Sequence, residues 1–244
     1  MKTIDINCDV GEGIENEELL MPYVSSCNIA CGGHYGDENT IRKTIELALH
    51  NKVKIGAHPS FPDTENFGRK IMDISFEDLK DSIESQLNLI MQQLDMYHVK
   101  LHHIKAHGAL YNLIAKDTET ASVYLDAIEK YAKNSYLFVP YNSVIDKLAQ
   151  ERNFKVNYEA FADRNYNSDL SLVARTTEKA LLTDSKSVLN HVMHMIQNNA
   201  VRTIENTDVP ILVDTFCIHG DHKNAFIILK ELTSLLKQQN IRIA

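Results

Sequence analysis

Short runs of alternating or continuous hydrophobic residues recur along the chain, and longer segments with helical periodicity separate them. The short runs predict strands, because strands repeat every two residues and helices every 3.6. Polar residues that can cap a helix precede most of the longer segments, with Asp37 or Asn39 as the first example. The predicted strands are 3–10, 25–31, 53–57, 99–104, 135–139, 154–160 and 211–218, and the predicted helices are 40–51, 75–97, 118–133, 143–152, 185–199 and one ending near 239.

Strands that alternate with helices throughout a chain indicate parallel βα units. Seven such strands in 244 residues, with no linker or composition break, predict a single α/β domain over residues 1–244. We expect a seven-stranded parallel (β/α) barrel of the TIM type. An open, doubly wound sheet is the alternative, but no glycine fingerprint of the dinucleotide-binding kind follows the first strand.

The first predicted strand carries polar residues along one whole face. Ile4, Ile6 and Cys8 alternate with these polar positions. A polar face packed against a helix would lose its hydration without gaining partners. We therefore expect the polar row to face the interior or the mouth of the barrel; it consists of Asp5, Asn7 and Asp9.

Composition excludes several classes of protein. The chain has 25 basic and 33 acidic residues, a net charge of −8, which argues against a general nucleic-acid binder. The N-terminal residues lack the apolar core of a secretory signal, and no apolar run is long enough to span a membrane, so we expect a cytoplasmic protein. We expect the cysteines to be small buried residues without disulfides; they are Cys8, Cys27, Cys31 and Cys217.

Six of the seven predicted strands end in side chains capable of chemistry. Each one alone could be a loop hydrogen-bonder or a helix cap. A barrel brings the carboxyl ends of all its strands to one mouth, so together they predict a single site there. The side chains are Asn7, Asp9, Asn28, His34, His58, Asp63, Lys105, His107, Glu159, Asp163, Arg164, His219 and Asp221.

Other histidines lie away from the strand ends. His102 and His103 occupy one predicted strand and must point to opposite sides, so one of them should reach the barrel interior. The remaining histidines are expected in surface or packing roles; they are His50, His98, His191, His194 and His222.

Seven strings in fixed order carry a resemblance to a known family. They are DINCDVGE (5–12), NIACGGH (28–34), GAHP (56–59), FGR (67–69), KAHGALYN (105–112), EAFADR (159–164) and HGD (219–221). Together they resemble the LamB/YcsF family, whose members form the A subunit of prokaryotic 5-oxoprolinase. The resemblance implies a seven-stranded α/β barrel related to glycoside hydrolase and polysaccharide deacetylase barrels. It also implies ATP-dependent hydrolysis of the lactam 5-oxo-L-proline to L-glutamate, together with two further oxoprolinase subunits, B and C.

The residue types suit this chemistry. A lactam is a poor electrophile, and phosphorylation of its oxygen by ATP would activate the carbon, after which a base must activate water. Lys105 and Arg164 could then contact phosphate and substrate carboxylate. Asp9, Glu159 and Asp163 are alternatives for the base, and His107 and His219 for the proton carrier. The expected catalytic residues are Asp9, Lys105, Glu159, Asp163, Arg164 and His219, and the expected substrate-binding residues are Asn7, Asn28, His34, His58, His107, Tyr111 and Asp221.

Two other functions remain open. Asp9, His34, His58 and His107 are also possible ligands of a divalent metal, which would favour a metal-dependent amide hydrolase or deacetylase that uses no ATP. The chain could instead be a non-catalytic subunit that binds oxoproline. No phosphate-binding GxxxxGK motif locates the ATP site. The long loops 59–73 and 165–182 are candidate lids.

Overall fold

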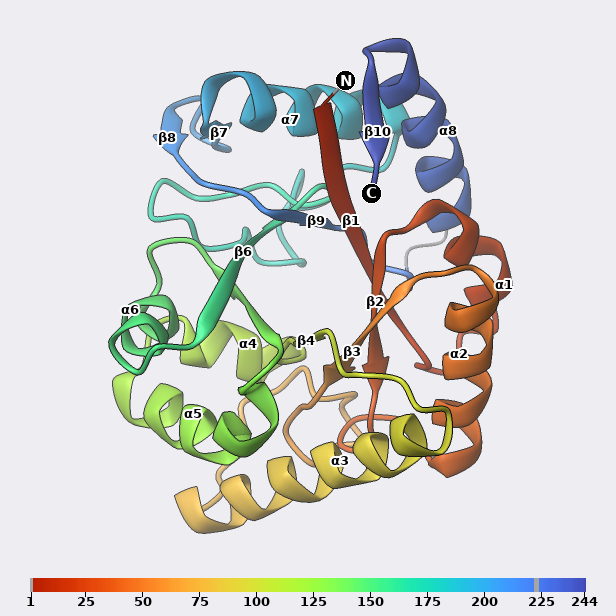
Figure 1. Cartoon of the computed structure of the whole chain (residues 1–244). Coiled ribbons are helices and arrows are strands. Elements are labelled where there is room, and N and C mark those ends of the chain that lie inside the picture. The colour runs from red at the N-terminus through yellow and green to blue at the C-terminus, as the bar shows by residue number, and fades with distance from the viewer. Residues whose placement is uncertain (1, 222–223) are drawn as a thin grey trace.

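Seven parallel strands close into a barrel, as the sequence predicts. The computed structural model describes residues 2–221 and 224–244, so the expectation for His222 lies outside the described residues. The strands follow each other around the barrel in chain order, and β1 pairs with β9 to complete the circle (Figure 1). They are β1 (Lys2–Val10), β2 (Ser26–Ala30), β3 (Lys54–His58), β4 (His103–Ile104), β5 (Tyr136–Pro140), β6 (Lys155–Phe161) and β9 (Thr215–Cys217).

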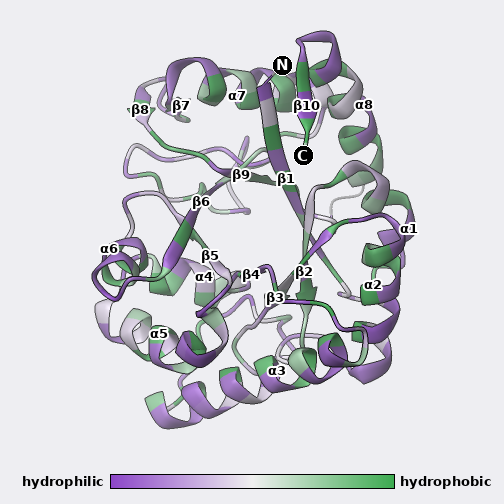
Figure 2. Ribbon diagram, viewed as in Figure 1, coloured by the Kyte–Doolittle hydropathy of each residue, from purple (hydrophilic) through white to green (hydrophobic). Residues whose placement is uncertain are grey.

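Helices surround the strands, and side-chain caps fix where several of them begin (Figure 1). Asp37, Ser75 and Ser143 each accept a hydrogen bond from a backbone N–H in the first turn of the helix that follows. The longest helix buries an apolar stripe and exposes a polar one (Figure 2). The helices are α1 (Glu17–Leu20), the 3₁₀ helix η1 (Met21–Tyr23), α2 (Glu38–His50), α3 (Phe76–Met96), α4 (Gly108–Ile114), α5 (Thr118–Ala132), α6 (Val144–Glu151), α7 (Ser185–Asn198) and α8 (Ala225–Gln238).

Several elements differ from the predicted ones. β4 keeps only two of the six predicted residues, because Val99 is still bonded to the last turn of α3. The predicted strand 211–218 shortens to β9, and the segment before it forms an antiparallel hairpin of β7 (Ala200–Arg202) and β8 (Asp208–Pro210). The C-terminal tail forms β10 (Ile241–Ile243), which pairs in parallel with the start of β1.

α2 buries only part of its apolar side. Ile41, Ile45 and Ala48 are buried, but Leu49 is 39% exposed. Four residues advance a helix by about 40° beyond a full turn, so Leu49 has rotated about 80° from Ile41 and leaves the core. All four cysteines are buried and free, which confirms the expectation for them. Within residues 2–221 and 224–244, no helix has the length and apolar character needed to cross a membrane.

The polar face of β1 points into the barrel, where its partners come from neighbouring strands. Asn7 donates to the Thr215 hydroxyl at 2.8 Å, and that hydroxyl donates to Asp5 at 2.7 Å. Asn28 donates to Asn7 and accepts from the His103 ring at 2.6 Å. The interior is therefore a hydrogen-bonded polar layer beneath the mouth, and His103, rather than His102, is the histidine that enters it.

Gly56 on β3 makes room for the buried His103 ring. A Cβ at this position would lie 2.1 Å from Nε2 of His103. We expect Gly56→Ala to displace the ring, break its bond to Asn28 and disturb its stacking on Phe138, lowering the free energy of unfolding by about 2–4 kcal/mol. Urea unfolding measures this loss. The double variant Gly56→Ala/His103→Ala removes the clash, so its loss should be smaller than the sum of the single losses; strict additivity would contradict the clash.

Candidate functional site

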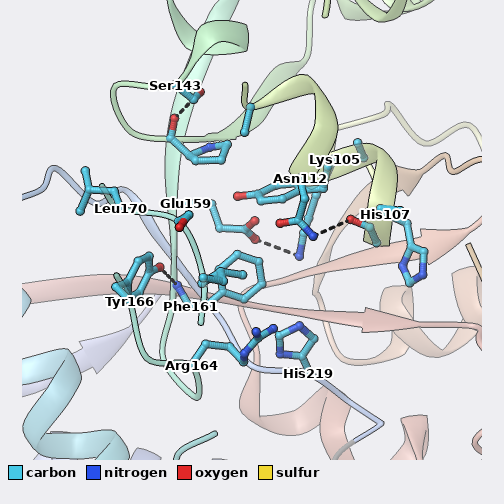
Figure 3. A pocket seen from close by; sticks show the side chains of 18 of the residues that line it. Lys105, His107, Asn112, Ser143, Glu159, Phe161, Arg164, Tyr166, Leu170 and His219 are labelled. Atoms are coloured by element: carbon cyan, nitrogen blue, oxygen red, sulfur yellow. Dashed lines mark hydrogen bonds and ion pairs between the residues drawn. The ribbon is translucent and has the colours of Figure 1, made fainter. Parts of the chain in front are cut away.

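Lys105 lies at the floor of the barrel mouth, directly after β4. Its ammonium is 2.9 Å from Oδ1 of Asp9 and 3.0 Å from Oε1 of Glu159, and the side chain is only 2% exposed. Burial alone would lower the pKa of Lys105, but Asp9 and the other negative groups around it raise that pKa well above its usual value. Lys105 is therefore a permanent cation at neutral pH, and Figure 3 shows it and Glu159 pointing toward each other.

Asn7 and Asn28 hold Asp9 from below. Asn28 donates to Oδ1 of Asp9 at 2.7 Å and to Oδ1 of Asn7 at 2.8 Å. Burial by itself raises the pKa of Asp9, but His58 and Lys105 outweigh it and hold that pKa well below the usual value. The two asparagines, which the sequence predicts to bind substrate, are fully buried and do not belong to the cavity lining; Asn28 positions the Asp9 carboxylate, and Asn7 accepts from Asn28.

A group of imidazoles and carboxylates forms the wall beside Asp9. Nε2 of His58 is 3.4 Å from Oδ2 of Asp9 and 3.0 Å from Nδ1 of His107. Nδ1 of His107 is also 3.3 Å from Oε1 of Glu12. One ligand atom from each of these four residues lies within 4.8 Å of the others, a spacing compatible with one metal ion.

Glu12 takes the place that the sequence assigns to His34 among the candidate metal ligands. Nε2 of His34 lies 2.9 Å from Oε1 of Glu12, and its ring stacks on His107 with centroids 3.7 Å apart. Burial, followed by the nearby His58, lowers the pKa of His34 to about 3, so the ring is neutral and donates to Glu12. Burial and the Asp9 charge raise the pKa of Glu12 itself to about 7.

Asp163 and His219 form a second hydrogen-bonded pair on the other side of the mouth. Nδ1 of His219 is 3.0 Å from both carboxylate oxygens of Asp163, and Oδ2 of Asp163 also accepts from the His219 backbone N–H at 3.0 Å. Burial raises the pKa of Asp163, but His219 more than compensates and holds it below its usual value. Asp163 does not line the cavity, whereas His219 does. The carboxylate thus fixes the orientation of an accessible imidazole.

Arg164 and Tyr111 add a buried cation and a phenol. Nη2 of Arg164 donates to the Val173 carbonyl at 2.6 Å, which anchors the guanidinium, and its Nε is buried without a hydrogen-bond partner in the described part of the chain. Figure 3 shows Arg164 and His219 at the same side of the cavity. Burial and then the Glu159 charge raise the pKa of Tyr111 well above its usual value, so its hydroxyl stays neutral.

These side chains surround a cavity of about 750 Å³, a size typical of small-molecule sites. Both long loops contribute to it: Arg69 comes from the first and Arg175 from the second, and each pairs with Asp221, Arg175 at 3.3 Å. The cavity is lined by expected and newly found ionisable residues, which are Asp9, Glu12, His58, Arg69, Lys105, His107, Glu159, Arg164, Arg175 and His219, together with Tyr111 and Asp221.

The structure brings residues from all six of the expected strand ends to one mouth. Four of the predicted residues are buried behind the side chains that line the cavity and do not line it themselves, namely Asn7, Asn28, His34 and Asp163. Asp63 is the exception, because its carboxylate accepts hydrogen bonds from Asn66 within the first long loop and does not belong to the cavity lining.

Sequence reasoning did not single out Glu12, Arg69 or Arg175 as site residues. Glu12 stands two residues beyond β1 between two glycines, a position that could have flagged it. Nothing comparable marks Arg175 within its long loop.

This fold and site define a parallel α/β-barrel protein with a charged cavity at the carboxyl ends of its strands. The chain belongs to the LamB/YcsF family, whose model matches residues 4–244. It is similar to the A subunit of 5-oxoprolinase from Oceanobacillus iheyensis, with 38% identity over 98% of this chain and 95% of that one. The corresponding 5-oxoprolinase chain of Histophilus somni is 37% identical over 100% of this chain and 98% of that one. The crystal structure of a lactam utilization protein from Thermus thermophilus superimposes with a TM-score of 0.92 and 31% identity, covering 100% of this chain and 99% of that one.

Proposed function

We propose that this chain is the A subunit of an ATP-dependent 5-oxoprolinase, which opens 5-oxo-L-proline to L-glutamate together with the B and C subunits. The observation that carries the proposal is the Lys105 ammonium, held by Asp9 and Glu159 at the floor of a cavity that also presents Arg164 and His219. The full-length similarity to proteins named as this 5-oxoprolinase component supports the choice of substrate.

The arrangement suits activation of a lactam by phosphorylation. ATP transfers its γ-phosphoryl group to the lactam oxygen, which gives ADP and an activated carbon. Lys105 balances the negative charge that gathers on the transferred group, and the Arg164 guanidinium, which lines the cavity, binds the substrate carboxylate. Water then attacks the carbon, and the C–N bond to the ring nitrogen breaks after that nitrogen gains a proton, which gives γ-glutamyl phosphate. A second water hydrolyses this acyl phosphate, and phosphate and glutamate leave.

His219 is the base that the geometry favours. Asp163 accepts a hydrogen bond from Nδ1 of His219, which leaves Nε2 to take up a proton. The negative charge of Asp163 then stabilises the positive charge of the protonated ring. Asp9 and Glu159 share the Lys105 ammonium, and this pairing makes them supports of the cation rather than proton acceptors. The proton from the attacking water thus passes to His219.

Reconstitution tests the proposal. Purified chain is mixed with candidate B and C subunits, ATP and 5-oxoproline, and glutamate and ADP are measured; we expect both products in equal amounts and only when ATP is present. Glutamate formed without ATP would favour the metal-dependent amide hydrolase, which the imidazole–carboxylate group makes the second candidate. Oxoproline binding with no loss of turnover when the His219 imidazole is removed would favour a non-catalytic binding subunit.

A further inference from the structure

Backbone carbonyl oxygens determine which ring nitrogen carries the hydrogen in two histidines of the mouth. Nδ1 of His58 lies 2.9 Å from the Lys105 carbonyl oxygen, and Nε2 of His107 lies 3.0 Å from the Phe67 carbonyl oxygen. A carbonyl oxygen only accepts, so each of these nitrogens must carry the hydrogen. In the neutral rings, the other nitrogens therefore present lone pairs: Nε2 of His58 and Nδ1 of His107.

These two lone pairs point at each other and at two carboxylates. The nitrogens are 3.0 Å apart, with Oδ2 of Asp9 3.4 Å from one and Oε1 of Glu12 3.3 Å from the other. None of the four atoms supplies a hydrogen to the group while the rings are neutral and both carboxylates are ionised. Four buried electron-pair donors in such close contact repel one another, and a cation among them would stabilise the group.

The spacing is that of a coordination shell. Nitrogen and oxygen ligands lie about 2.0–2.2 Å from a divalent transition ion, so neighbouring ligands at angles of about 90–109° are about 2.8–3.6 Å apart. Three of the measured separations, 3.0, 3.3 and 3.4 Å, fall in this interval, and all four ligand atoms lie within 4.8 Å of one another. Metal-bound histidines commonly donate their other N–H to a carbonyl oxygen, as both rings do here.

Charge and access agree with a divalent ion. Asp9 and Glu159 share the single ammonium of Lys105, and Glu12 adds a third carboxylate beside His107. All four candidate ligands line the cavity, so an ion can enter and its remaining coordination positions face the space where substrate binds. A shared proton would also pair the two nitrogens, but it would give the carboxylates of Asp9 and Glu12 one positive charge, whereas a divalent ion gives them two.

We propose that Asp9, Glu12, His58 and His107 bind one divalent first-row transition ion at the mouth of the barrel. Two nitrogen and two oxygen ligands suit zinc, manganese, iron or cobalt rather than calcium or magnesium. The role of the ion rests on the function proposed above: it holds a water or a substrate oxygen at its open position, next to Lys105. Binding of the ion itself rests only on the four residues.

The test uses untagged chain stripped with a chelator, without ATP, oxoproline or partner subunits. Calorimetric titration with Zn²⁺ and visible absorption with Co²⁺ should both show about one ion per chain, with cobalt bands typical of mixed nitrogen and oxygen ligands. Loss of a residue that only hydrogen-bonds a metal ligand typically weakens metal binding by about 10- to 100-fold. Glu12→Gln and His107→Gln should each weaken metal binding by more than this. His194→Gln, which changes an exposed histidine paired with Asp208, is the matched control and should bind as the wild type does.

Each outcome decides the proposal. No ion bound by the wild type at millimolar concentration overturns it and leaves a shared proton as the cation. Equal affinity of the wild type and both ligand variants also overturns it. Circular dichroism shows which variants fold, and His58→Gln replaces any that does not. An oxoprolinase that works fully after chelation would overturn the catalytic role of the ion but not its binding or the proposed enzyme, whereas metal binding by a chain that is inactive in reconstitution would support the site and overturn the proposed function.

Discussion

Lys105→Met should abolish measurable oxoprolinase turnover in the reconstituted enzyme, with a fall of at least about 10³-fold, because it removes the cation on which the charge of the transferred phosphoryl group would rest. Methionine keeps the unbranched chain as far as the ε position and removes the ammonium. The oxoproline-dependent formation of glutamate is the measurement. Near-normal turnover would contradict the role proposed for Lys105.

The same substitution should destabilise the fold. Asp9 and Glu159 would be left buried without their common partner, and breaking a buried ion pair from one side costs about 3–5 kcal/mol. The loss should depend on pH. Burial raises the pKa of Asp9, but His58 and Lys105 outweigh burial and hold that pKa below its unfolded value. The stabilisation of the fold by these contacts of Asp9 is therefore present at pH values above the usual aspartate pKa and fades as pH falls. The difference in unfolding free energy between variant and wild type should therefore be largest near neutral pH and shrink in acid.

Lys130→Met is the matched control for both measurements. Lys130 is exposed and pairs with Glu84 at 2.8 Å on the outer helices. Exposed pairs contribute little to stability. The control variant should keep the activity and the unfolding midpoint of the wild type, and a loss equal to that of Lys105→Met would show that the effect is not specific to the mouth.

The order and type of the barrel elements could be predicted from the sequence because they depend on local signals. The alternation of β1 and caps such as Asp37 and Ser75 act over a few residues. β10 and the β7–β8 hairpin could not be predicted in the same way. Their stability comes from pairing with residues distant in sequence, as Lys2 does with Ile241, or from a turn without a strong signature.

The members of the site could be predicted because parallel barrels place strand ends together, but their division of labour could not. Asn7 and Asp9 lie two residues apart on the same face, and only the partners from other strands show that one supports the other. Glu12 enters the site because a glycine with positive φ on each side turns the chain back toward His34 and His107. Such long-range contacts determine the role of each residue.

Asp163→Asn should lower the turnover number by about 10²–10⁴-fold while the fold is retained. The asparagine oxygen can still accept from the His219 backbone N–H, so the loop keeps its anchor. The amide lacks the charge that stabilises a proton on the His219 ring, and it can reverse the tautomer by donating to Nδ1. The Michaelis constants for ATP and oxoproline should change little, because Asp163 does not line the cavity.

A double-variant comparison tests whether the pair acts as one unit. His219→Gln should cost about as much as Asp163→Asn, and the double variant should be scarcely slower than the worse single variant, since removing either member disables the other. Asp208→Asn is the control, because Asp208 forms the same kind of contact with His194, at 2.8 Å, on the surface. Multiplicative losses in the double variant, or a similar loss in the control, would contradict a catalytic Asp163–His219 pair and return the role of base to Asp9 or Glu159.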